Sequence, residues 1–327
     1  MSKPVGVALT AGVALCAEQM IVVPANALQT TAMETRLTFD LNNLCVGFID
    51  ALVNCPFVYR QDELTNPSVF RVFFGAIVHI SRVGMSDSLP DLRKEALVDS
   101  LIQMIRSRRV SDAISVIDSH EDPTAIGSAL NSVVKRLYRE YSDVTDMIVA
   151  GNIGLDYCLR KSAAESNEEK RRELKKLGKI IAFNTAANCW PGWGDPGIII
   201  EEAHLGSAIK LATQSRDLVQ ELALGPREQG TAHWLVGALE LAAGRFGAAR
   251  VAFEQAEQIS LAANATSVYA LMARGYIALA RKADPQSRPE GMNMLSETLA
   301  RLRAEGSKDA IFFADQLATA DRVLLEK

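Results

Sequence analysis

Glu201 and His204 are the residues in this sequence whose types and spacing come nearest to a metal site. They lie three positions apart on a predicted helix, so a carboxylate and an imidazole would project from one helix face. Ferritin-like carboxylate sites take such a Glu-x-x-His motif from each of two helices, and the sequence has no second copy. We therefore expect this pair to bind no metal ion.

A second polar cluster, residues 118–122, has the sequence Asp-Ser-His-Glu-Asp. These side chains are suited to binding a divalent cation or to acid–base chemistry. They are consecutive, however, and they lie between two predicted helices, with Pro123 directly after them. This arrangement is typical of a polar turn, and we interpret the cluster as one.

The five cysteines occur at irregular spacing, with no Cys-x-x-Cys pair and no neighbouring pair of histidines. They are Cys16, Cys45, Cys55, Cys158 and Cys189. The pattern argues against a zinc site and is typical of buried thiols in a reducing compartment. The sequence also has no Gly-x-Ser-x-Gly turn, phosphate loop, dinucleotide fingerprint or His-Glu-x-x-His motif. We therefore expect a chain without catalytic residues, cofactor or metal.

Basic residues are concentrated in residues 170–176, Lys-Arg-Arg-Glu-Leu-Lys-Lys, which could attract an anionic partner. We interpret this stretch as the solvated face of an amphipathic helix, supported by Glu168 and Arg172 at i,i+4. The net charge of −4 and the pI near 5.7 argue against a nucleic-acid surface, which needs a basic stripe.

No apolar run reaches the roughly 18 residues of a transmembrane helix. The longest candidate, residues 69–80, is interrupted by Arg71, Gly75 and His79. It is predicted to be a buried helix in which His79 is a hydrogen-bonded core side chain. We expect no integral membrane span.

The elements that must position these residues are helices. Apolar residues recur with a period of 3.6 from Thr38 onward, strand patterns are nearly absent, and hydrophobic residues make up 48% of the chain. Helix starts are marked at Asn66-Pro67, at Ser88 to Pro90, at Asp122-Pro123, and at Ser166, which would form a capping box with Glu169. The sequence therefore predicts an all-α fold.

Residues 190–197, Trp-Pro-Gly-Trp-Gly-Asp-Pro-Gly, interrupt the helices because they hold two prolines and three glycines. We place the main internal boundary there. The predicted parts are an apolar amino-terminal segment (1–30), a helical domain (31–189), this junction loop (190–197) and a second helical domain (198–327).

Trp190 and Trp193 give the junction loop two interpretations. Exposed indoles would contact a partner, since they supply area and a hydrogen-bond donor. Alternatively, the rings fill a groove between the two helical halves, since tryptophans are usually well buried.

Residues 233–256 carry small and large side chains where two short antiparallel helices must touch. Gly237 and Ala249 permit close approach of the backbones, Gly244 turns the chain, and Phe253 fills the space that is left. This pattern resembles a tetratricopeptide (TPR) repeat, a helix–turn–helix unit that stacks with its neighbours. The sequence departs from the family at one position, where Glu240 or Leu241 stands in place of the usual tyrosine, and near Ser260, where no proline closes the unit.

The resemblance implies antiparallel helix pairs stacked as an α–α superhelix, a TPR-like solenoid, over residues 198–327. Residues 31–189 would be diverged repeats or a separate helical domain. A groove lined by the first helix of each pair would bind a protein or peptide partner, so the expected function is a non-catalytic scaffold. Polar first-helix residues are expected to set its specificity: His233, Glu240 and Arg274.

Two other functions stay open. The chain could be the sensor or regulatory module of a bacterial signalling or transcription complex, with the ATPase or DNA-reading part on another chain. It could also be an all-helical enzyme without a recognisable motif. A deep pocket with buried carboxylates would favour the enzyme.

The amino terminus has the order of a signal peptide, with Lys3, an apolar stretch over 5–17 and Ala25-Asn26-Ala27. Cleavage after Ala27 would export the chain. Glu18 and Gln19 interrupt the apolar stretch early, which favours a retained helix and a cytoplasmic location.

Overall fold

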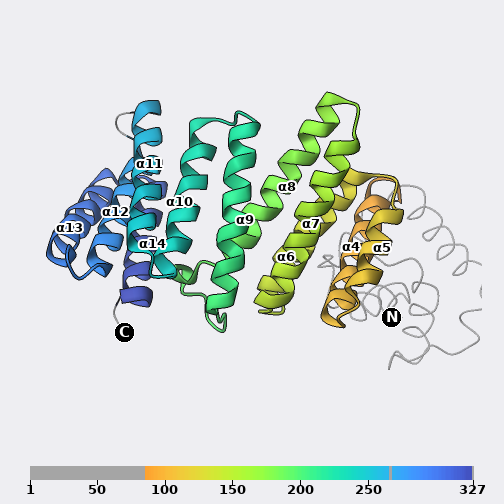
Figure 1. The fold of residues 1–327 in the computed structure, drawn as a ribbon, viewed down its shortest axis with the longest axis horizontal. Helices are drawn as coiled ribbons and strands as arrows, with labels where there is room; N and C mark the ends of the chain where they lie inside the picture. The colour runs from red at the N-terminus through yellow and green to blue at the C-terminus, as the bar shows by residue number, and fades with distance from the viewer. Residues whose placement is uncertain (1–84, 265–266, 326–327) are drawn as a thin grey trace, which may run out of the picture. The chain divides into compact units, whose positions relative to one another are not determined.

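The fold is all-helical over the residues that the structure, a computed structural model, describes: 85–264 and 267–325. These residues form eleven α-helices and one short 3-10 helix, with no strand among them (Figure 1). The all-α prediction is confirmed for this part of the chain. The elements are α4 (Met85–Arg106), α5 (Val110–Ser119), α6 (Pro123–Arg139), α7 (Val144–Ala164), α8 (Glu168–Asn188), η1 (Pro191–Trp193), α9 (Glu202–Glu221), α10 (Pro226–Ala242), α11 (Phe246–Ala263), α12 (Val268–Ala283), α13 (Arg288–Glu305) and α14 (Lys308–Leu325).

The chain divides into two units, residues 1–96 and residues 97–327. Of the first, the structure describes only residues 85–96, which are helical. The amino-terminal segment 1–30, the predicted helix at 66–80 and three of the five cysteines lie outside the described residues. None of the described helices is long and apolar enough to cross a bilayer.

Helices α6 and α8 begin at, or one residue from, the capping residues predicted from the sequence. Asp122 accepts hydrogen bonds from the backbone N–H groups of Thr124 (2.9 Å) and Ala125 (3.0 Å), so α6 begins at the predicted place. At α8 the predicted cap is wrong by one residue. Asn167, and not Ser166, accepts from the Lys170 N–H at 3.0 Å, and asparagine caps a helix at least as well as serine.

The helix predicted to open at Ser88 to Pro90 begins earlier, at Met85. Pro90 therefore lies inside α4 and not at its start. Pro90 lies after the first four residues of α4, whose N–H groups have no partner within the helix, so its missing N–H removes one helical hydrogen bond.

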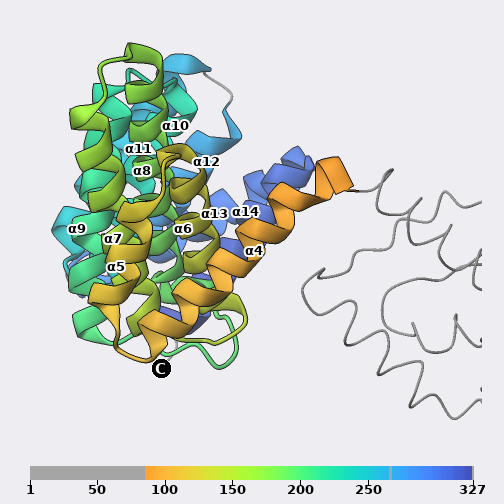
Figure 2. The same cartoon turned by 90° about the vertical axis from the view of Figure 1, so that its right-hand side faces the viewer.

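Successive helices from α6 to α13 pack side by side and alternate in direction (Figures 1 and 2). We call α10 and α12 the first helices, and α11 and α13 the second helices, of two consecutive pairs. In the pair α10–α11, a Cβ built on Gly237 would lie 2.7 Å from Phe253 Cδ1, so only glycine fits there. Ala249 is fully buried on α11, and Gly244 turns the chain with φ of +72°. The predicted close contact between these two helices is confirmed at Gly237.

The basic stretch 170–176 forms the solvated face of an amphipathic helix, as predicted: Lys170, Arg172 and Lys176 are exposed and Leu174 is buried. Two of its cations also contact α9. Arg172 donates to the Leu222 carbonyl at 2.5 Å, and Lys175 forms an ion pair with Glu221. Both partners lie at the carboxyl end of α9, where free carbonyls and the helix dipole attract cations. The predicted Glu168–Arg172 support is replaced by an ion pair between Glu168 and Arg171 at 3.2 Å.

Candidate functional site at the tryptophan turn

Residues 190–195, which we call the tryptophan turn, connect α8 to α9 and are fixed from two sides. The Trp193 indole Nε1–H donates to the Ala187 carbonyl at 2.7 Å, at the end of α8. The Tyr138 hydroxyl of α6 donates to Asp195 Oδ2 at 2.5 Å. Burial and the neighbouring Asp195 carboxylate both raise the pKa of Tyr138, so this phenol stays protonated. These two hydrogen bonds therefore hold the tryptophan turn against α8 and α6.

An aromatic cluster joins the tryptophan turn to the first helices. Tyr276 of α12 lies at its centre, with ring centroids 6.1 Å from Trp190, 5.5 Å from Trp234 and 5.2 Å from Phe253. The rings are tilted or edge-to-face, the arrangements that aromatic pairs prefer. Trp193 meets Trp234 at 6.1 Å. The cluster thus includes all three tryptophans of the chain.

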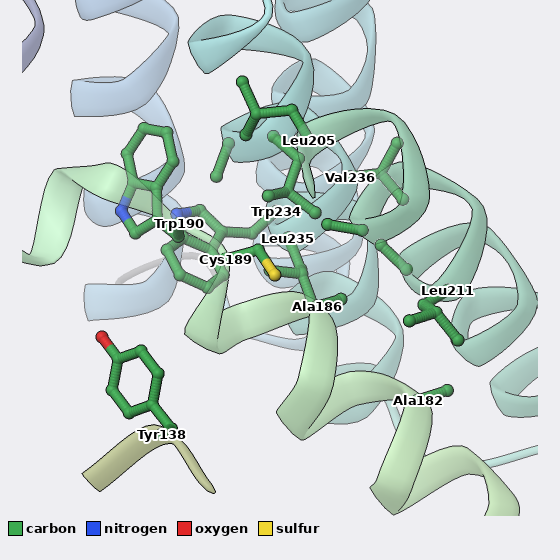
Figure 3. Close-up of a cluster of buried hydrophobic side chains, with 14 of the residues drawn as sticks. Tyr138, Ala182, Ala186, Cys189, Trp190, Leu205, Leu211, Trp234, Leu235 and Val236 are labelled. Carbon is green, nitrogen blue, oxygen red and sulfur yellow. The ribbon is translucent and has the colours of Figure 1, made fainter. Parts of the chain in front are cut away.

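Trp190 is 1% exposed, so its ring is part of the interior, while Trp193 is half-buried. Figure 3 shows Trp190 and Trp234 beside each other, with Cys189 next to them. Of the two interpretations of the turn, the observed packing is that of rings that fill space between helices.

The electrostatics of the cluster keep its groups neutral. Burial raises the pKa of the Tyr276 hydroxyl, an effect only partly opposed by the indoles of Trp190 and Trp234. Burial also raises the pKa of the Cys189 thiol to about 12. A neutral phenol, a neutral thiol and two indoles are suited to packing, and they offer neither a base nor a nucleophile near neutral pH.

Helix α14 turns back to the tryptophan turn and lies along α12. The side chains of Thr319 and Val323 lie against Gly194 in the turn. Leu317 lies over Gly275 of α12, and the Lys282 ammonium contacts both oxygens of Asp321 at 2.6 and 2.8 Å.

Apart from Gln316, the face of α14 that meets the array is apolar. Its buried residues are Ala310, Phe313, Ala314, Gln316, Leu317 and Ala320. Phe313 meets the Tyr269 ring of α12 edge-to-face at 5.2 Å. On the other side, Ile311 and Phe312 are 49% and 55% exposed. Helix α14 therefore carries apolar side chains on its outward face too.

The three polar residues predicted to line a groove have different neighbours. His233 is half-buried on α10, and burial, together with the nearby Arg216, lowers its pKa. Glu240 forms an ion pair with Arg245 at the α10–α11 turn. Arg274 pairs with Glu257 of α11 at 3.8 Å. Glu240 and Arg274 are therefore engaged within their own part of the array, whereas the buried Nδ1 of His233 has no hydrogen-bond partner.

The metal candidates serve as structural groups. His204 Nδ1 accepts from the Glu201 N–H at 3.1 Å and its Nε2 lies 3.0 Å from Thr145 Oγ1, so the ring caps α9. Asp118 pairs with Arg160 at 3.3 Å. Within the described part of the chain, no three His, Cys, Asp or Glu side chains gather in a metal-binding group.

A cavity of about 230 Å³ lies between α5 and α7, lined by Ile114, Ile117, Asn152, Ile153, Asp156, Tyr157 and Arg160. It is smaller than the roughly 300–1,000 Å³ of ordinary ligand pockets. Asp156, the carboxylate in its lining, is exposed and paired with Arg160 at 2.8 Å. This cavity therefore lacks the buried carboxylate that would favour acid–base chemistry.

Sequence reasoning missed Tyr269, Gly275 and Lys282 as a set, because they matter only through contact with α14. The sequence pattern that indicates this contact lies on α14. Phe313, Leu317 and Asp321 recur every four residues, which places them on one helix face.

No protein-family model matches this chain, and no curated protein matches it. Function is therefore inferred from the geometry of this site.

Proposed function

We propose that the chain is a non-catalytic protein-interaction scaffold with TPR-like helix pairs, and that it binds a helix of a partner protein. The binding face consists of first helix α12 and the tryptophan turn, and α14 lies on it. The observation that carries the proposal is the placement of α14. A helix is held on this face by an aromatic contact, a glycine hollow and an ion pair.

The packing of the α10–α11 pair supports the TPR-like part of the proposal. Gly237 meets Phe253 where the helices touch, and Gly244 turns the chain between them, which is the small–large pattern of the repeat. The next pair, α12–α13, packs on it through the contact of α11 with α12. Stacked pairs of this kind expose one row of first helices to a partner.

The chemistry of the face supports a helical partner with an apolar stripe and an acidic residue. Tyr269 and Gly275 provide an aromatic ring and a hollow for a large apolar side chain. Lys282 provides a cation that is only 19% exposed and so is best met by a carboxylate. Grooves that bind amphipathic helices use a few such anchors at helical spacing.

The proposal is tested by isolating the tagged full-length chain from its native cells and identifying the bound proteins by mass spectrometry. Lys282→Glu reverses the charge on the binding face. Arg250→Glu makes the same change on second helix α11, where Arg250 pairs weakly with Glu254 at 3.9 Å. A partner retained by Arg250→Glu and lost by Lys282→Glu supports the proposal. A chain with no specific partner, or equal losses in both variants, contradicts it.

A further inference from the structure

Helix α14 lies where a binding partner of this face would lie, and a short linker joins it to α13. It follows α13 through Gly306 and Ser307 alone, and Gly306 has φ of +77°, a conformation suited to a sharp reversal. After this turn α14 follows α12 and reaches the tryptophan turn. In both views it lies beside α12 (Figures 1 and 2).

Three contacts join α14 to α12, and their residues on α14 are evenly spaced. Phe313 meets Tyr269, Leu317 lies over Gly275, and Asp321 pairs with Lys282. Residues 313, 317 and 321 follow one another at i, i+4 and i+8, so they form a single stripe. The two helices run parallel, because each later residue of α14 meets a later residue of α12.

This interface contains polar groups as well as apolar ones. Gln316 is 8% exposed, and its Oε1 has no hydrogen-bond partner. The ion pair between Lys282 and Asp321 keeps 19% and 16% exposure. A buried acceptor without a partner weakens a contact, since its lost hydration is not replaced.

We infer that α14 is a resident occupant of a helix-binding site, and that the partner helix carries the same pattern: an aromatic residue, then leucine four residues later, then an acidic residue four residues after that. Alanine or another small residue stands beside the aromatic one, as Ala314 stands beside Phe313. The partner displaces α14 when it binds. This inference rests on the proposed scaffold function and names the chemistry of its partner.

Tethering explains why α14 would hold the site against a free helix. A short linker gives the attached helix an effective concentration in the millimolar range, which a micromolar peptide does not match. Weakening the resident helix without touching Tyr269, Gly275 or Lys282 should therefore open the site. The change Leu317→Ala with Asp321→Ala does this, because both residues belong to α14.

The test uses the full-length chain and a fluorescently labelled peptide of residues 308–325, with binding followed by fluorescence anisotropy. The opened chain, Leu317→Ala with Asp321→Ala, should bind the peptide about tenfold or more tightly than the wild-type chain. Equal binding to the two chains, or no binding to the opened chain, overturns the inference.

A charge exchange in the opened chain tests the register. Adding Lys282→Glu to the opened chain should weaken binding of the wild-type peptide and should restore it for the Asp321→Lys peptide. Circular dichroism checks that each chain keeps its helices. If Lys282→Glu binds both peptides alike, the proposed pairing is wrong. If the peptide does not bind but a cellular partner still depends on Lys282, the scaffold function stands and only this inference is wrong.

Discussion

Leu317 of α14 lies so close to Gly275 of α12 that a Cβ built on Gly275 would be 2.3 Å from Leu317 Cδ1. Side-chain carbons do not approach each other so closely, so the position admits glycine alone unless Leu317 moves. Leu317 is itself fully buried. This one contact therefore links the terminal helix to the first helix of the preceding pair, and with it to the tryptophan turn.

Gly275→Ala should displace α14 and destabilise the fold by about 1–3 kcal/mol, the usual cost of overpacking a tight contact. The matched control is Gly247→Ala on α11, where an added Cβ meets nothing within 4 Å. Because alanine favours a helix over glycine by about 1 kcal/mol, the control should be neutral or stabilising. Urea unfolding followed by tryptophan fluorescence measures the free energy of unfolding of both variants. A Gly275→Ala chain as stable as Gly247→Ala would contradict the contact.

Ala249→Leu should lower the melting temperature, because Ala249 is fully buried on α11 where this helix packs on α10. The expected cost is again about 1–3 kcal/mol. Val251→Leu, two residues away and 53% exposed, is the control and should melt like the wild-type chain. If Ala249→Leu also melts at the wild-type temperature, the close packing of this pair is wrong.

The ion pair between Lys282 and Asp321 should couple α12 to α14 by about 1 kcal/mol, near the top of the range for partly exposed pairs. A double-mutant cycle with Lys282→Gln and Asp321→Asn measures this coupling. The more exposed pair of Arg250 and Glu254, 3.9 Å apart, should give about 0.5 kcal/mol or less. Added salt should reduce both couplings. A coupling at Lys282 and Asp321 no larger than that of the control pair would argue against a specific contact.

Alkaline pH should destabilise the fold through its buried thiols. Burial raises the pKa of Cys158 and of Cys189 from 9.0 to about 12. The unfolded chain therefore releases these protons first, and the thiols' contribution to stability is intact below pH 9 and lost between pH 9 and 12. The loss is on the order of 1 kcal/mol per pH unit for each thiol.

Urea unfolding between pH 8 and 11 measures this loss. As the pH rises, the free energy of unfolding of the double variant Cys158→Ala with Cys189→Ala should fall less steeply than that of the wild-type chain. Tyr157, whose pKa burial raises from 10.0 to about 12, leaves a remaining slope above pH 10. Identical slopes for the two chains would show that the thiols are not held protonated.

Local signals made the helices predictable, because caps and turn residues act on their nearest neighbours. Asp122 caps α6 through its own side chain, and Gly244 ends a helix through its own backbone. The residue that caps α8 is Asn167 and not the predicted Ser166, which shows the limit of such local signals. Two adjacent residues can both cap, and packing further along the helix decides between them.

The candidate site was less predictable because its contacts join distant segments. Whether Trp190 is exposed depends on Tyr276, which lies on another helix and fills the space beside it. Arg274 looked like a groove residue, yet Glu257 of the neighbouring helix is its partner. The reversal of α14 onto α12 depends on the fit of Leu317 to Gly275, and no local pattern contains that fit.

Site-specific photo-crosslinking from position 269 tests the central claim, that this face binds a partner protein, most directly. Tyr269 is replaced by p-benzoylphenylalanine, an aromatic residue that is larger than tyrosine, in the full-length chain in its native cells. The same replacement at Val251 on the second helix α11 is the control. We expect a discrete adduct with another protein from position 269, besides the crosslink within the chain to α14, and none from position 251. Crosslinks from position 269 that stay within the chain, or the same adduct from both positions, would contradict the claim.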